Sequence, residues 1–374
     1  MSRETHIDHL LQQHIVSDGV APLAAAAVAS CSTQSRWSSA WGAAGTYAPL
    51  RDALCSDSTL FDLASLTKPL FAVCLAHWLA RSDSHSLDTP LGDWLQSAQD
   101  SALASLSIGA LLSHRSGLKP HLELYAEYAA GGEFRRAQEI ARVLGALRPG
   151  IAPGNIVDPA AVYSDLGYVL LGLGWEQQLG RPLHLVLEQE LSRHGMLYTA
   201  SAESLRKRSS DAERHFAPTE EVAWRGGLIA GQVHDDNAWL LSGTGCSGHA
   251  GLFGTVHDVA RFGCAVLDSL QDRHPTLDRK ILQTLTRRRD GSSLRMGFDG
   301  KVQGEASSVG NVLGPETFGH LGFTGTSFWC DPENLVVVVL LTNRVCPSRR
   351  NLGIRRARPF VHDALAARGL ALRN

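Results

Sequence analysis

The chain has 374 residues, which is enough for one large domain or two of moderate size. Hydrophobic residues make up 44% of it and charged residues 19%, the proportions of an ordinary globular protein that can bury a substantial core. The formal net charge of −2 gives no support for binding to nucleic acid or to a membrane surface. No segment approaches about 18 uninterrupted apolar residues, so we expect no membrane span.

The N-terminus and the cysteines both favour a cytoplasmic protein. Residues 1–16 lack the long uncharged apolar core of a signal peptide, and Ile7, Leu10, Leu11 and Ile15 fall at helical spacing. Seven cysteines are scattered without close pairs or metal-ligand spacing, which fits reduced thiols better than a disulfide framework. We therefore expect the chain to be cytoplasmic.

The first strands are expected near the N-terminus. Residues 23–30, L-A-A-A-A-V-A-S, look like a strand, and residues 36–43 could be its hairpin partner. An apolar helix follows from about residue 65 to 81. The middle, about 85–300, combines several helical patterns with Gly- and Pro-rich loops.

The C-terminal part has clearer signals. Residues 318–330 are predicted to form a strand, and 331–334, D-P-E-N, have turn chemistry. Residues 335–341, L-V-V-V-V-L-L, are typical of a central buried strand, and a last helix is expected over about 355–368.

Because strands cluster at both ends and helices in the middle, we predict an α+β fold. Residues 1–80 and 300–374 would form one discontinuous sheet domain, and residues 81–299 a mainly helical insertion.

The pattern S-x-x-K occurs three times, as Ser65/Lys68, Ser116/Lys119 and Ser204/Lys207. Only Ser65 begins an apolar helix; the other two pairs are expected to be solvated. Residues three apart share a helix face, so Ser65 Oγ and Lys68 Nζ can meet, and Pro69 places residues 65–68 in the first turn. There the helix dipole favours an oxyanion. The alternative is that Ser65 is merely an N-cap.

Two further stretches complete a pattern, Tyr163-Ser164-Asp165 and His320-Leu321-Gly322. With the S-x-x-K helix, they make the sequence resemble the penicillin-recognising serine hydrolases: class C β-lactamases, D-alanyl-D-alanine carboxypeptidases and related esterases. That family carries S-x-x-K, then Y-x-N, then K-T-G or H-x-G. The resemblance implies a β-lactamase/transpeptidase-like fold, with an antiparallel sheet flanked by terminal helices and an inserted all-α domain, and an active site between the two.

The resemblance also implies a mechanism. Ser65 would attack a carbonyl and form an acyl-enzyme, with Lys68 and Tyr163 acting as a coupled pair that supplies the base. The backbone N–H groups of Ser65 and Phe323 would form the oxyanion hole. The substrate would be a small ester, amide or peptide, and no cofactor or metal is implied.

Two departures from the family pattern matter. Asp165 stands where the family has asparagine, and a carboxylate favours a protonated Lys68. We hypothesise that Lys68 stays charged and that Tyr163 is the base, its pKa lowered by that charge. Alternatively, Ser164-Asp165 could be aligned with an S-D-N motif, but Leu166 would then occupy the asparagine position. His320 replaces the lysine of K-T-G and is mostly neutral at pH 7, which weakens the anchoring of a substrate carboxylate, a role to which Gly322 and its strand contribute.

These departures rank carboxylesterase first, a peptidase or amidase on peptidoglycan fragments second, and β-lactamase third. A non-catalytic alternative is a ligand sensor that acylates without turnover, or a structural homologue.

Three other groups of residues have two interpretations each. Residues 233–237, V-H-D-D-N, could suggest a metal site, but loop hydrogen bonding is preferred because no complementary spaced ligands follow. His249 is structural or catalytic. Tyr125 and Tyr128 line the substrate pocket or belong to the core.

Overall fold

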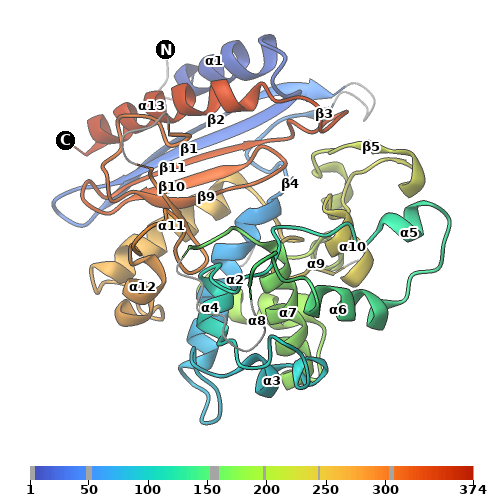
Figure 1. Ribbon diagram of the computed structural model, residues 1–374. Coiled ribbons are helices and arrows are strands. Elements are labelled where there is room, and N and C mark those ends of the chain that lie inside the picture. The colour runs from blue at the N-terminus through green and yellow to red at the C-terminus, as the bar shows by residue number, and fades with distance from the viewer. Residues whose placement is uncertain are drawn as a thin grey trace.

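The structure, a computed structural model, describes residues 5–47, 53–151, 160–196, 199–242, 245–302 and 307–373. A seven-stranded antiparallel sheet crosses it, with α1 and α13 on one face and most of the helices on the other side (Figure 1). The strand order is β3-β2-β1-β11-β10-β9-β8. Both ends of the chain contribute to this sheet, so the predicted α+β architecture is confirmed.

Three strands of the main sheet lie close to predicted ones, those at 23–31, 37–47 and 336–342, whereas the short strands at 53–54 and 299–300 were not predicted. The strands of this sheet are β1 Leu23–Cys31, β2 Trp37–Tyr47, β3 Ala53–Leu54, β8 Asp299–Gly300, β9 Phe318–Leu321, β10 Ser327–Asp331 and β11 Val336–Thr342. One prediction is wrong: residues 318–330 are not a single strand. The turn at 322–326 divides them into β9 and β10, which pair with each other. Two short pairs lie outside this sheet: β4 Phe61–Asp62 with β7 Phe253–Gly254, and β5 Glu221–Val222 with β6 Gly227–Leu228.

The central strands β1 and β11 are buried on both faces because helices cover both. Alternate residues of each strand join two separate cores, one beneath α1 and α13 and one shared with α2 and α11. Small residues allow the close contact: a Cβ on Gly369 of α13 would come within 2.7 Å of Val28, and one on Gly263 of α11 within 2.5 Å of Val337. This explains why both strands are nearly continuous apolar runs instead of alternating ones.

The helices that pack on the sheet are α1 Thr5–Leu11, continued by a π-helical turn Gln12–Ser17, then α11 Val256–Leu270 and α13 Ile354–Leu372. Helix α12 Arg279–Thr286 packs against α11 and α2. The remaining helices are α2 Thr67–Leu79, α3 Leu91–Trp94, α4 Ile108–Leu112, α5 Ala126–Ala129, α6 Arg136–Leu144, α7 Asp165–Leu179, α8 Leu183–Arg193, α9 Ala202–Arg208 and α10 Asp236–Ser242. Short 3₁₀ turns lie at Ala64–Leu66, Gln96–Ala98, Ala212–Arg214 and Ala223–Arg225.

The division into a sheet domain and a helical insertion stays a prediction. α11 falls within the predicted insertion, yet it packs against β1, β10 and β11. All seven cysteines are free thiols. Among the described residues, no helix is long and apolar enough to cross a membrane.

Candidate active site

The turn before α2 fixes the position of Ser65. Ala64, the preceding residue, has a φ of 48°, a left-handed conformation that is strained for a residue with a Cβ. The buried carboxylate of Asp62 holds this turn, because its Oδ1 accepts a hydrogen bond from Ala64 N at 2.8 Å. Ser65 then lies in the 3₁₀ turn that leads into α2, so the prediction that residues 65–68 form the opening turn is confirmed.

Three of the predicted side chains meet at Ser65. Lys68 Nζ lies 2.9 Å from Ser65 Oγ, and Tyr163 OH donates to the same oxygen at 2.9 Å. Lys68 also donates to Asp165 Oδ1 at 2.7 Å and is fully buried. Ser65 Oγ is therefore contacted by two proton-bearing groups, and the ammonium beneath it has a carboxylate partner. Burying a charged lysine in an apolar helix is energetically costly, and the ion pair with Asp165 offsets that cost.

The electrostatics of this cluster differ from what we hypothesised. Burial raises the pKa of Tyr163 well above 10, and the charge of Asp165 raises it further, so the expected lowering by Lys68 is wrong. Burial lowers the pKa of Lys68, although Asp165 opposes this. Burial of Asp165 works against its ionisation, but Lys68 holds its pKa well below the usual range. Tyr163 thus keeps its proton more firmly than Lys68 does.

His114 packs against the ring of Tyr163. The two rings stack with centroids 4.8 Å apart, and His114 Nδ1 accepts a hydrogen bond from Ser164 N at 3.1 Å. Burial lowers the pKa of His114 to about 3, so the imidazole is neutral and can accept this bond. His114 therefore has a structural role.

The segment after β9 lies against the Ser65 turn. Thr324 Oγ1 donates to Asp62 O at 2.8 Å, and Thr326 Oγ1 donates to Leu63 O at 3.1 Å. A Cβ on Gly322 would lie 1.9 Å from Thr326 Oγ1, so this position excludes any larger residue. These contacts hold the backbone of residues 322–326 beside the nucleophile, where an oxyanion hole would need it.

His320 lies near the end of β9, and Phe323 lies in the turn that follows it. Burial and the charge of Lys68 lower the pKa of His320 to about 3, so it is neutral at pH 7, and its Nδ1 lies 2.8 Å from Leu321 O. The Phe323 side chain is 51% exposed. Arg344 holds its peptide, since Arg344 Nε donates to Phe323 O at 2.8 Å.

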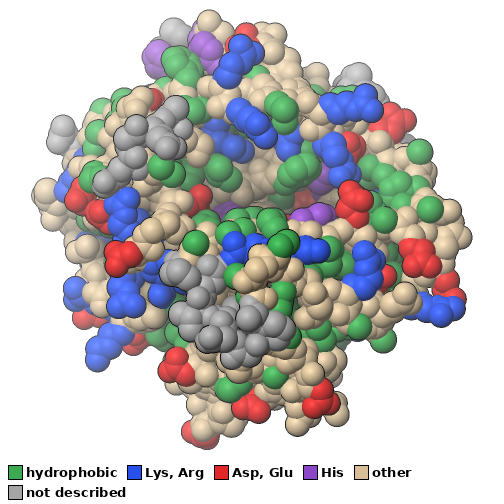
Figure 2. Space-filling view, viewed as in Figure 1, with side chains coloured by type: hydrophobic (Ala, Val, Ile, Leu, Met, Phe, Trp, Pro, Cys, Tyr) green, Lys and Arg blue, Asp and Glu red, His purple; other side chains and the backbone are tan. Residues whose placement is uncertain are grey.

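These residues surround a cavity of about 650 Å³. Figure 2 shows a hollow near the middle of this face, with histidine side chains along it. The lining is formed by Ala64, Ser65, Pro120, His121, Tyr125, Tyr163, Asp165, His234, Asp235, Asp236, Ala250, Leu294, Asp299, His320, Leu321, Gly322, Phe323 and Arg349. The sequence predictions included Ser65, Tyr163, Asp165, His320, Gly322 and Phe323, and the structure brings all of them to this one cavity.

Other predicted residues have mixed outcomes. Tyr125 lines the cavity and stacks on Trp224 at 5.8 Å, whereas Tyr128 is 40% exposed. The two other S-x-x-K serines, Ser116 and Ser204, are buried instead of solvated, which corrects that expectation. Their lysines are exposed and lie outside the cavity.

The segment 233–237 was considered as a metal site. Among the described residues, no group of three or more His, Cys, Asp or Glu side chains is arranged to hold a metal ion. Asn237 instead accepts a hydrogen bond from Leu124 N and donates to Leu122 O, and Asp236 forms ion pairs with Arg225 and Arg349. The sequence analysis missed that Asp235 faces the active-site cavity.

The chain belongs to the β-lactamase family, whose pattern it matches over residues 13–360. It is a serine hydrolase of that family. A putative D-alanyl-D-alanine carboxypeptidase of Salmonella agona (strain SL483) is 28% identical over 334 residues, covering 82% of this chain and 75% of the relative.

Two solved structures have a similar fold. The D-amino acid amidase of Ochrobactrum anthropi SV3, complexed with L-phenylalanine amide, is 22% identical with a TM-score of 0.66, over 97% of this chain and 98% of that one. EstCE1, a hydrolase with promiscuous acyltransferase activity, is 20% identical with a TM-score of 0.67, over 95% and 98%. The predicted family and fold are confirmed, and small-molecule esters and amides are substrates typical of this family.

Proposed function

We propose that the chain is a carboxylesterase that works through an acyl-enzyme on Ser65. The charge of the cavity carries this proposal. His320 is neutral where related enzymes have a lysine. The arginine among the described lining residues, Arg349, is already bound to Glu220 and Asp236. Among the described lining residues, a substrate carboxylate, as in a β-lactam or a D-alanine terminus, would find no unpaired lysine or arginine, whereas an ester needs none.

The geometry supports a definite order of proton transfers. The step requires the neutral form of Lys68, and burial favours that form by lowering the pKa of Lys68. In that form, Ser65 Oγ attacks the ester carbonyl and passes its proton to Lys68 Nζ, which then becomes the ammonium partner of Asp165. The oxyanion is stabilised by the N–H groups of Ser65 and Phe323. The leaving alkoxide takes a proton from Tyr163, which Lys68 restores, and water then hydrolyses the acyl-enzyme. Tyr163 suits this role because burial keeps it protonated.

Amide hydrolysis is the second candidate. An amine leaves only when it is protonated, and Tyr163 holds a proton 2.9 Å from Ser65 Oγ, where the leaving group departs. The named carboxypeptidase and amidase among the similar proteins also support it. A peptidase on cell-wall fragments would have to dispense with a carboxylate anchor, which is why it ranks below the esterase.

Hydrolysis of p-nitrophenyl acetate and butyrate, beside a chromogenic cephalosporin, tests the proposal. We expect ester turnover to fall roughly 10³-fold or more in Ser65→Ala. It should persist in Ser204→Ala, the matched control, since that serine has the same S-x-x-K pattern outside the cavity. Rapid cephalosporin hydrolysis would contradict the esterase assignment. A stable acyl mass on Ser65 without turnover would make the chain a ligand sensor instead.

A further inference from the structure

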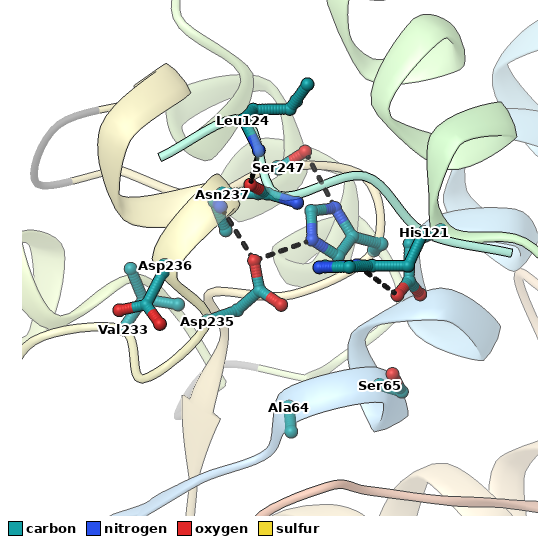
Figure 3. Close-up of polar contacts among 12 residues, drawn as sticks. Ala64, Ser65, His121, Leu124, Val233, Asp235, Asp236, Asn237 and Ser247 are labelled. Carbon is teal, nitrogen blue, oxygen red and sulfur yellow. Dashed lines mark hydrogen bonds and ion pairs between the residues drawn. The ribbon is translucent and has the colours of Figure 1, made fainter. Parts of the chain in front are cut away.

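Asp235 presents to the active-site cavity one carboxylate oxygen that has no hydrogen-bond partner among the described residues. Its Oδ1 accepts hydrogen bonds from His249 Nε2 at 2.9 Å and from Ala238 N at 2.7 Å. Within the ranges that the structure describes, Oδ2 has no hydrogen-bond donor or cation within reach. Figure 3 shows this second oxygen turned toward the side where Ser65 and His121 lie.

The carboxylate is held in a fixed place relative to the nucleophile. His249 is buried, and its other ring nitrogen, Nδ1, lies 3.1 Å from Ser247 Oγ, so both nitrogens have partners. The backbone carbonyl of the same histidine accepts a hydrogen bond from Lys68 Nζ at 3.4 Å. One residue therefore connects Asp235 with the lysine beneath Ser65, and binding of a ligand would require little reordering.

Two other carboxylates of the cavity wall are paired with cations. Asp165 pairs with Lys68, and Asp236 pairs with both Arg225 and Arg349. Asp299 accepts a hydrogen bond from the backbone of Gly300 at 2.8 Å. Asp235 has no lysine or arginine partner among the described residues, and its ion-pair contact with His249, at 2.9 Å, is made through Oδ1, which leaves Oδ2 available to a ligand.

Two of the histidines of the wall do not cancel the charge of Asp235. Burial lowers the pKa of His234 and of His320 to about 3, so both are neutral at pH 7. A hydrogen bond to Asp165, whose Oδ2 lies 3.7 Å from His121 Nδ1, raises the pKa of His121, and the more distant charge of Asp235 raises it further. Burial works against ionisation of Asp235, but His249 brings its pKa to about 2. Asp235 is thus an anion at neutral pH.

We propose that Asp235 binds a protonated amine of the substrate, so that the preferred substrates are esters, or amides, of amino acids whose amino group is free. This inference rests on the proposed function of Ser65. The amine belongs on the acyl side, because the leaving group departs beside Tyr163 and His320. Asp235 is the residue after His234, whose ring stacks on that of Phe323 with centroids 5.7 Å apart. This places Asp235 at the end of the oxyanion hole away from Tyr163 and His320. The amine stays protonated and takes no part in the bond changes.

An isosteric pair of substrates tests the inference. Methyl esters of D- and L-alanine carry an ammonium group where methyl isobutyrate carries a methyl group, and all three can be followed by methanol release at about pH 6.5. For the better alanine enantiomer, we expect a kcat/KM at least about tenfold above that of methyl isobutyrate, the size of one charge-assisted hydrogen bond.

Two variants decide whether Asp235 causes the preference. Asp235→Asn keeps an oxygen that accepts hydrogen bonds from His249 and Ala238 N but removes the charge. It should lower the ratio of kcat/KM for alanine methyl ester to kcat/KM for methyl isobutyrate about tenfold. Asp299→Asn removes the same charge from another part of the same wall and should leave the ratio as it was. A wild-type ratio of one or less, a ratio unmoved by Asp235→Asn, or an equal loss in Asp299→Asn would overturn the inference.

A failure of the proposed function would look different. If the proposed function is wrong, Ser65→Ala and wild type will not differ in ester hydrolysis. Calorimetric titration of Ser65→Ala then decides the inference alone: alanine methyl ester should bind more tightly than methyl isobutyrate, and adding Asp235→Asn should weaken its binding about tenfold. Equal binding of the two esters would overturn it.

Discussion

Asp62 should make the stability of the fold depend on pH. Burial raises its pKa to about 6 from an ordinary value of 3.8, because the two hydrogen bonds from Ala64 N and His234 N only partly offset the loss of water. The native state therefore binds this proton more tightly than the unfolded chain does. The stability that Asp62 contributes is complete below pH 3.8 and is lost as pH rises through 6.

The size of the effect follows from the two pKa values. The full loss is about 3 kcal/mol, and about 2 kcal/mol of it falls between pH 4.5 and 7.5. Asp62→Asn removes the titration, and its amide has one acceptor oxygen and one donor group, like the protonated acid. We therefore expect the variant to lack this part of the pH dependence.

Urea unfolding at pH 4.5 and 7.5 measures the difference. When the pH is raised from 4.5 to 7.5, the unfolding free energy of wild type should fall by about 2 kcal/mol relative to that of Asp62→Asn. Asp57→Asn, a half-exposed carboxylate five residues earlier, serves as the control and should follow wild type. If Asp62→Asn showed the wild-type pH dependence, the reasoning from burial would be refuted.

Three further predictions concern the reaction. Asp165→Asn removes the anion 2.7 Å from Lys68 Nζ, so the pKa of Lys68 should fall further and the acidic limb of the kcat/KM profile should move to lower pH; an unmoved limb would mean that Lys68 is not the titrating base. His320→Lys restores a cation, and the rate of cephalosporin hydrolysis relative to that of p-nitrophenyl acetate should rise about tenfold; an unchanged ratio would remove the argument from carboxylate anchoring. Tyr163→Phe should lower kcat by roughly 10²-fold for an alkyl ester and much less for a p-nitrophenyl ester, whose leaving group needs no proton. Equal losses for both esters would contradict a role in protonating the leaving group.

Local patterns were enough to predict the elements that carry the motifs. The β-branched run of residues 336–342 and the proline after Lys68 act over a few residues, so β11 and the start of α2 could be placed from sequence. The interruption of residues 318–330 was harder to predict. Its cause is the packing of Gly322 against Thr326 and Leu63, a contact that no spacing rule contains.

The charge of the cavity could not be predicted because pairing, not composition, determines it. The carboxylate of Asp165 is neutralised by a lysine 97 residues away, and Asp236 by an arginine 113 residues away. Asp235, their neighbour in the cavity, has its hydrogen bonds from a histidine 14 residues away and keeps its charge. In the sequence these three residues look alike, and V-H-D-D-N indicated loop hydrogen bonding in preference to a metal site, with no sign that Asp235 faces the cavity. Only the folded arrangement distinguishes an acid that stabilises the catalytic lysine from one that is free to select a substrate.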